Sequence, residues 1–115
     1  MRGTKRQDAI LKAMRLLIPR APLADFGPIL EAATSARMKT LPPQIAAWLS
    51  IIAYIRHVHS EYDALLADGY ERDAARFFVR EAIDEVLTGW GCQRRLEEHD
   101  DEATDMSEPV TPRPL

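Results

Sequence analysis

The chain has 115 residues, 46% of them hydrophobic, a length and composition that suit a single compact domain. Its formal net charge of -3 conceals halves of opposite sign, since residues 1–56 carry nine basic and three acidic side chains and residues 57–115 carry six and fifteen. A single cysteine excludes an intramolecular disulfide, and the longest uncharged run, residues 40–55, is shorter than the roughly 20 apolar residues of a membrane-spanning helix. We therefore expect a cytoplasmic protein without a membrane segment, because disulfide-free chains are typical of reducing compartments.

Two helices are predicted in the first third of the chain. Apolar residues recur at helical spacing over about residues 6–18, and Pro19 then ends the helix. Lys12 and Arg15 interrupt this apolar stretch, which is therefore unlike the hydrophobic region of a secretory signal. A second amphipathic stretch predicts a helix over about residues 25–37.

A long third helix and a fourth helix are expected to form an antiparallel pair. The third begins at the Pro42–Pro43 pair and continues without a break to Gly69, because glycine readily adopts the left-handed conformation of a helix end. The fourth covers about residues 71–90. No segment shows the alternation of a strand, so the expected fold class is all-α, a small bundle of about four helices.

The composition changes at residue 97. Residues 97–115 contain seven acidic side chains, one basic side chain and three prolines. Such a segment buries too little apolar surface to offset the entropy lost when it is ordered. We predict a helical domain over residues 1–96 and a disordered acidic tail over residues 97–115, which would shield the basic half of the domain from other polyanions.

Several charged side chains fall on the face of the third helix that should be buried. On an ideal helical wheel, Arg56, His59 and Asp63 continue the apolar stripe that contains Ile52. His57 falls on the opposite side, so we expect His57 to be exposed and His59 to be buried. A charge on a core face needs a partner, a ligand or water, which makes this stretch the most informative in the sequence.

The fourth helix also carries arginines on its buried face. Arg72 and Arg76 lie on or beside its apolar stripe, and a hairpin about Gly69 brings Asp63 level with Arg76. Asp63 is therefore predicted to pair with Arg76 or Arg72. The candidate binding site comprises Arg56, His59, Tyr62, Asp63, Arg72 and Arg76.

This cluster has three interpretations. The simplest is a buried ion-pair network that fixes the register of the two helices. The second is a site for an anionic ligand, because arginine binds oxyanions through paired hydrogen bonds. The third is a small acid–base enzyme, in which His59 is the general acid or base and Asp63 orients it.

The sequence gives little support for a metal site, a bound cofactor or a catalytic nucleophile. His57 and His59 point to different faces of a continuous helix, and the neighbouring arginines oppose a cation. There is no glycine-rich phosphate loop and no nucleophile elbow, and Cys92 has no base near it in the sequence. We therefore expect neither a metal nor a cofactor, and no catalytic residue is assigned.

The residues around the cluster form a long pattern of mixed chemistry. It consists of Arg56, His57, His59, Ser60, Tyr62, Asp63, Leu65, Leu66, Gly69, Arg72, Ala75, Arg76 and Trp90. This pattern resembles the domain of unknown function family 2293 (DUF2293), over roughly residues 7–95. Ser60 stands where the resemblance implies a threonine, a change that keeps the hydroxyl. The resemblance implies a bacterial or fungal family without an established activity, so it supports the domain boundary and brings no mechanism.

We expect the domain to be a small helical binding module for an anionic partner, with nucleic acid as the first candidate. The basic N-terminal half and the arginines support this function. The main alternative is a structural or protein-interaction domain, in which Phe77 on the outer face of the fourth helix contacts a protein partner or a second copy of the chain. The third possibility is the acid–base enzyme that uses His59.

Overall fold

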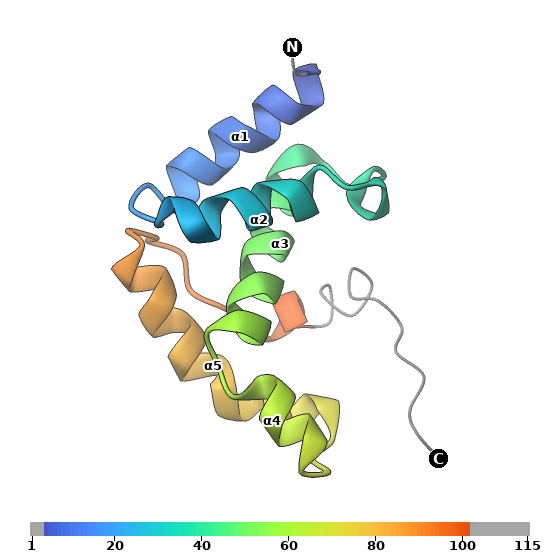
Figure 1. Ribbon diagram of the computed structural model, residues 1–115, viewed down its shortest axis with the longest axis vertical. Helices are drawn as coiled ribbons and strands as arrows, with labels where there is room; N and C mark the ends of the chain where they lie inside the picture. Colours follow the sequence, from blue (N-terminus) through green and yellow to red (C-terminus); the bar gives the residue numbers. More distant parts are fainter. Residues whose placement is uncertain (1–3, 102–115) are drawn as a thin grey trace.

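The computed structural model describes residues 4–101, which form helices joined by short turns (Figure 1). The helices are α1 (Lys5–Leu17), α2 (Leu23–Ala33), the 3-10 helix η1 (Ala36–Met38), α3 (Pro43–Val58), α4 (Tyr62–Ala67) and α5 (Arg72–Gly89). No strand occurs in the part of the chain that the structure describes, which confirms the all-α prediction. None of the described helices is both long enough and apolar enough to cross a lipid bilayer.

The first helix begins and ends where its sequence predicts. Thr4 and Gln7 form a capping box, in which Thr4 Oγ1 accepts from Gln7 N at 3.0 Å and Gln7 Oε1 accepts from Thr4 N at 2.9 Å. Ile10 and Met14 lie on one face and are fully buried. The C-cap residue precedes Pro19, which cannot continue the helix.

The second helix is shorter than predicted. α2 ends at Ala33 instead of near residue 37, and the chain continues as η1. The hydroxyls of Thr34 and Ser35 donate to backbone carbonyls of α2 at 2.8 and 2.6 Å. These bonds compete with the backbone bonds of another helical turn, which accounts for the early end.

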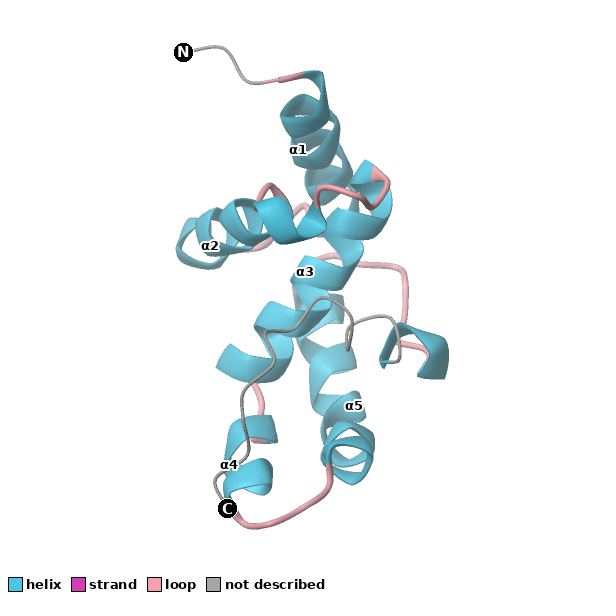
Figure 2. Ribbon diagram, turned by 90° about the vertical axis from the view of Figure 1, so that its right-hand side faces the viewer, coloured by secondary structure: helices cyan, strands magenta, loops and turns pink. Residues whose placement is uncertain are grey.

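α3 is the central helix of the fold. Figure 2 shows α1 and α2 at one end of α3 and the α4–α5 hairpin at the other. Trp48, Ile51, Ile52 and Ile55 are almost completely buried within α3. Because the helix has no charged residue before Arg56, it can be covered on several sides at once.

The predicted long third helix is interrupted after Val58, so this prediction is wrong. His59 is the C-cap of α3, and the Ser60 hydroxyl donates to Arg56 O while accepting from Tyr62 N at 3.2 Å. Ser60 therefore satisfies backbone groups at the end of α3 and at the start of α4. The helical wheel drawn for α3 does not apply to the side chains after Val58.

The turn between α4 and α5 follows the prediction for Gly69. This glycine has a φ of 96°, in the left-handed region, and the next residue, Tyr70, donates its N–H to Leu65 O at 3.1 Å. The same arrangement ends α5, where Gly91 has a φ of 85°. A Cβ at Gly91 would also lie only 3.0 Å from the ring of Pro19.

Beyond α5 the chain turns back along the bundle. Leu96 N donates to Asp84 Oδ1 at 2.9 Å, and the Arg94 guanidinium lies 4.1 Å from the centroid of the Trp48 ring. The segment then forms a helical turn that lies beside α3 in Figure 1.

This turn corrects the boundary predicted after Leu96. Asp100 and Asp101 are 2% and 7% exposed, so residues 97–101 belong to the folded domain and not to a disordered tail. Their apolar content is low, but their carboxylates are buried against basic side chains, which composition alone does not reveal. The rest of the predicted tail, residues 102–115, lies outside the described residues.

Candidate functional site

Arginines from α3 and α5 converge on a single acidic residue. Arg56 Nη2 donates to Asp101 Oδ1 at 2.6 Å, and Arg80 Nη2 donates to Asp101 Oδ2 at 3.1 Å. Arg76 Nη1 donates to the backbone carbonyl of Asp101 at 3.0 Å. We call Arg56, Arg76 and Arg80 the arginine cluster.

The helices fix the positions of these side chains. Arg56 follows Ile52 by one helical turn on the buried face of α3, and Arg76 and Arg80 lie one turn apart on α5. Because α3 and α5 pack against each other, their arginines face the same space. The ring of Tyr62, itself 1% exposed, lies 5.5 Å from the Arg56 guanidinium carbon and lines another side of it.

Two members of the arginine cluster, Arg56 and Arg76, are deeply buried. Arg56 is 0% exposed and Arg76 is 2% exposed, while the Asp101 side chain is 10% exposed. A buried guanidinium is stable only with hydrogen-bond acceptors around it, and a carboxylate supplies the strongest ones. Removal of either partner from such a pair is strongly destabilising.

A cavity of about 200 Å³ lies beside the arginine cluster. Arg76 and Arg80 line it together with the carboxylates of Asp73, Glu98 and Asp101. Acidic groups outnumber the arginines along its wall, so an added anion would be repelled there while Asp101 holds its present position.

The structure brings together only part of the candidate site predicted from the sequence. Arg56, Tyr62 and Arg76 lie side by side in the core. Arg72 is exposed at the first residue of α5. The remaining two residues, His59 and Asp63, have other partners.

The predicted pairing of Asp63 with an arginine is wrong. Asp63 Oδ1 lies 2.7 Å from His57 Nδ1, and the Asp63 side chain is 61% exposed. The break after Val58 rotates Asp63 away from the face that a continuous helix would give it. His57 is 38% exposed at its side chain, which confirms the exposure predicted for it.

His59 belongs to a second cluster, with Asp25 and Tyr54. Asp25 Oδ1 accepts from the Tyr54 hydroxyl at 2.8 Å and lies 2.7 Å from His59 Nε2. The His59 side chain is 35% exposed, so the predicted burial of His59 is wrong. Its ring meets the rings of Tyr54 and Trp90 edge to face. In the enzyme interpretation, the carboxylate that orients His59 is therefore Asp25 and not Asp63.

Hydrogen bonds and burial shift the pKa values of two acids in this second cluster. The bond from His59 is the main cause that lowers the pKa of Asp25 below its usual range, and the bond from Tyr54 adds to it. Burial raises the pKa of the Tyr54 hydroxyl, and the neighbouring Asp25 carboxylate raises it further. The pair is therefore held as a carboxylate and a neutral phenol.

Four residues of these clusters were missed in the sequence. None of Asp25, Tyr54, Arg80 and Asp101 was among the predicted site residues. Arg80 carried a usable signal, because it lies one turn beyond Arg76 on the same helix. Asp101 carried none, since an acid in an acidic segment looks the same whether or not it is buried.

Neither a metal site nor a reactive thiol emerges from the described side chains. Within residues 4–101, no group of three or more His, Cys, Asp or Glu side chains is placed to hold a metal ion. Cys92 is buried and its thiol lies 3.4 Å from Arg94 O. Burial raises the pKa of the Cys92 thiol, which disfavours the nucleophilic thiolate.

The arginine cluster lies in the part of the chain that can be related to other proteins. The chain matches no curated protein and no solved structure. Residues 13–91, from α1 to the glycine after α5, match the model of the family described as "Uncharacterized conserved protein (DUF2293)". This match includes all three arginines of the cluster and ends before Asp101. Since it spans more than half of the chain, the protein belongs to the uncharacterized conserved family DUF2293.

Proposed function

We propose that the chain is a small helical binding module for an anionic partner and that the arginine cluster receives an oxyanion of that partner. The observation that carries this proposal is the convergence of Arg56, Arg76 and Arg80 on Asp101. Donors from two packed helices are preorganised, so little side-chain entropy is lost when an oxyanion binds them.

In this proposal Asp101 occupies the position that an oxyanion of the partner would take when it binds. The three arginines lie within the family domain, and Asp101 lies beyond it, on the last turn that the structure describes. A short peripheral turn opens at lower free energy than the long helices of a core. An external oxyanion would therefore enter when the turn of residues 97–101 leaves, and the partner would compete with the chain's own acid.

The basic composition of the N-terminal half supports an anionic partner but does not identify it. Two of the basic residues in the N-terminal half serve the fold, because Arg56 is buried and Arg6 donates to the carbonyls of Met38 and Leu41 at 2.6 and 2.7 Å. Nucleic acid is one class of partner. An acidic protein segment is the other, and its chemistry is that of Asp101 itself.

The test compares Asp101→Asn with Asp68→Asn, which removes the same charge from an exposed residue at the end of α4. The probes are a single-stranded oligonucleotide and a peptide with the sequence of residues 97–115. At low salt, Asp101→Asn should bind at least one probe about tenfold more tightly than Asp68→Asn does. For the oligonucleotide, the gain should shrink as salt rises, because phosphate contacts release counterions.

A second variant tests whether the arginines carry this gain. Adding Arg80→Gln to Asp101→Asn should remove this gain in affinity. Arg80 has the most exposed side chain of the arginine cluster, at 32%, and is therefore the arginine most accessible to a probe. All measurements are made below the melting transition of each variant. Equal gains for Asp101→Asn and Asp68→Asn would attribute the binding to net charge and contradict the proposal.

The second candidate is a structural or protein-interaction domain in which the arginine cluster is a buried ion-pair network. The complete burial of Arg56 favours it. So does an exposed aromatic patch formed by Tyr70, Phe77 and Phe78, which are 45%, 67% and 61% exposed. This candidate predicts that Asp101→Asn lowers stability and leaves the affinity for both probes unchanged.

The proposed setting of this module is the cytoplasm. A single buried cysteine with a raised thiol pKa requires no oxidising environment. An arginine cluster that competes for acidic partners also suits a compartment rich in nucleic acid and acidic proteins. Fractionation of cells that express the chain tests this location.

A further inference from the structure

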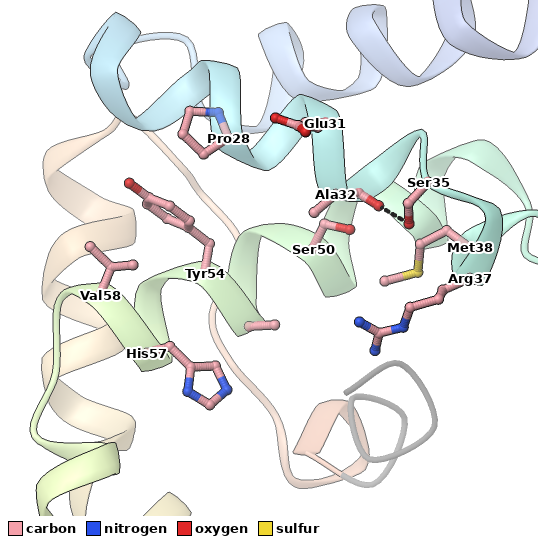
Figure 3. A pocket seen from close by; sticks show the side chains of 11 residues that line it. Pro28, Glu31, Ala32, Ser35, Arg37, Met38, Ser50, Tyr54, His57 and Val58 are labelled. Carbon is pink, nitrogen blue, oxygen red and sulfur yellow. Dashed lines mark hydrogen bonds between the residues drawn. The ribbon is translucent and has the colours of Figure 1, made fainter. Parts of the chain in front are cut away.

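A cavity of about 470 Å³ lies between α2, η1 and α3, away from the arginine cluster (Figure 3). Small-molecule sites commonly have volumes of roughly 300–1,000 Å³. The walls of this cavity include Pro28 and Ala32 from α2, Met38 from η1, and Ala53 and Val58 from α3. Most of the surface that lines the cavity is apolar, although polar residues also contribute to it, so the cavity suits the apolar body of a ligand.

Ser50 supplies an unsatisfied polar group to this cavity. The residue is 2% exposed, yet its hydroxyl has no hydrogen-bond partner within the described part of the chain. Figure 3 shows its side chain on α3 next to Ala32 of α2. Buried hydroxyls are nearly always hydrogen-bonded, so this one points to a group that the cavity is built to receive.

Charge is distributed unevenly around the opening. Arg37 lies on η1 at the end of the cavity near Ser50, exposed and engaged in no ion pair within residues 4–101. Tyr54 and Val58 lie toward the other end (Figure 3). Glu31 on α2 is the carboxylate at the rim. One end of the cavity therefore carries a cation and a hydroxyl, while the other end is lined by Tyr54, His57 and Val58.

We propose that this cavity binds an amphipathic small molecule with an aliphatic body and a carboxylate head. The head pairs with the Arg37 guanidinium and accepts the hydrogen bond of the Ser50 hydroxyl, and the body lies along Ala53 and Val58. The site is separate from the arginine cluster and does not depend on the function proposed for it.

The probes are octanoate, 1-octanol and acetate, followed by amide NMR spectra of the full chain. Octanoate should shift the amides of Ala32, Ser50 and Ala53 saturably. 1-Octanol, which keeps the body and lacks the charge, should bind the same residues about fivefold more weakly. Acetate, which keeps the charge and lacks the body, should produce no saturable shift there. Absence of a saturable octanoate shift at about 10 mM would overturn the proposal.

Charge variants at the rim give opposite effects. Arg37→Gln should weaken octanoate about fivefold and leave 1-octanol unchanged, while Glu31→Gln should strengthen octanoate about twofold. Lys12→Gln, on α1 and outside the cavity, is the matched control and should change neither ligand. If Arg37→Gln and Lys12→Gln weakened octanoate equally, the effect would be one of net charge, and the assignment of the head would be wrong.

Two further variants separate binding from folding. Ser50→Ala should weaken octanoate without lowering the melting temperature, because the hydroxyl that it removes is unsatisfied in the free protein. Ala32→Trp should block both octanoate and 1-octanol, and Ala24→Trp, at another exposed position of α2, should block neither. Binding of octanoate to Ala32→Trp with unchanged affinity would place the ligand elsewhere and contradict the proposal.

Discussion

Asp25 shows how one side chain joins parts of the protein that are distant in sequence. It accepts hydrogen bonds from the tyrosine and histidine of α3 and its C-cap, which tie α2 to the end of the central helix. The side chain of Asp25 is 14% exposed, so these bonds are partly shielded from water. A bond to the ionised carboxylate stabilises the fold only while that carboxylate keeps its charge.

This contact predicts a dependence of stability on acid. The pKa of Asp25 is lower in the folded chain than in the unfolded chain, so its contribution is complete above about pH 4 and is lost as the pH falls through the folded value. Asp25→Asn should therefore reduce the free energy of unfolding at pH 7 and flatten its fall below about pH 4. Urea unfolding measured between pH 7 and pH 3 checks this.

The control for this prediction is Asp68→Asn, because Asp68 makes no side-chain hydrogen bond within residues 4–101. It should unfold with the same pH dependence as the unchanged chain. A variant Asp25→Asn whose stability still falls as steeply with acid as that of the unchanged chain would show that this carboxylate does not supply the stability.

At the scale of the elements, the informative feature is the division of the predicted third helix into α3 and α4. Ser60 bonds backbone groups on both sides of the break, and the chain changes direction there. Apolar periodicity continues through Tyr62 and Leu66, so a helical pattern alone does not mark the end of α3. The positive φ of Gly69, by contrast, follows directly from the absence of a Cβ.

Substitutions at two glycines test this interpretation of the helix ends. Gly69→Ala should destabilise the fold by about 1–2 kcal/mol, because its φ of 96° disfavours a residue with a Cβ. Gly89→Ala, at the last residue of α5, should stabilise it by about 0.5–1 kcal/mol, since alanine favours the helix and a Cβ there meets nothing within 4 Å. Thermal unfolding of both variants gives the comparison. A similar sign for the two would mean that the backbone of Gly69 relaxes at little cost.

At the scale of the whole molecule, the most informative contact joins the last described turn to the arginine cluster. α3 and α5 each bring buried guanidinium groups to a place where no apolar neighbour can satisfy them. Asp101 returns along the bundle and supplies both carboxylate oxygens and its carbonyl. The turn of residues 97–101 therefore packs against the domain and at the same time supplies the acceptors of the arginine cluster.

Truncation of the chain measures what this closure contributes. A chain that ends at Leu96 loses Asp101 and should be destabilised by about 3 kcal/mol or more, since buried guanidiniums lose their carboxylate. That loss corresponds to a fall in melting temperature of about 10 °C or more. A chain that ends at Ala103 keeps the turn and should melt within about 3 °C of the full chain.

The two truncated chains differ from each other only in residues 97–103. Both chains lose the rest of the acidic segment, so any difference between them arises from residues 97–103. A chain ending at Leu96 with an unchanged melting temperature would show that the buried arginines are satisfied without Asp101.

The sequence by itself determined the fold class, the first helix, the turn at Gly69 and the presence of arginines on buried faces. Each of these depends on local properties: apolar spacing, a capping residue, the absence of a Cβ, or the position of a charge on one helix. Arg56 and Arg76 were identified for this reason, because each lies on the buried face of its own helix.

Only the tertiary structure decided which partners these side chains take. Asp63 bonds His57, Asp25 bonds His59, and Asp101 satisfies the arginine cluster, although no helical pattern links these pairs. A hydrogen bond between residues 34 or 45 positions apart depends on how the helices pack, and a break of a few residues after Val58 redirects every side chain that follows. The burial of Asp101 in an acidic segment arises from packing alone, because its charge becomes favourable only where the guanidiniums of α3 and α5 meet.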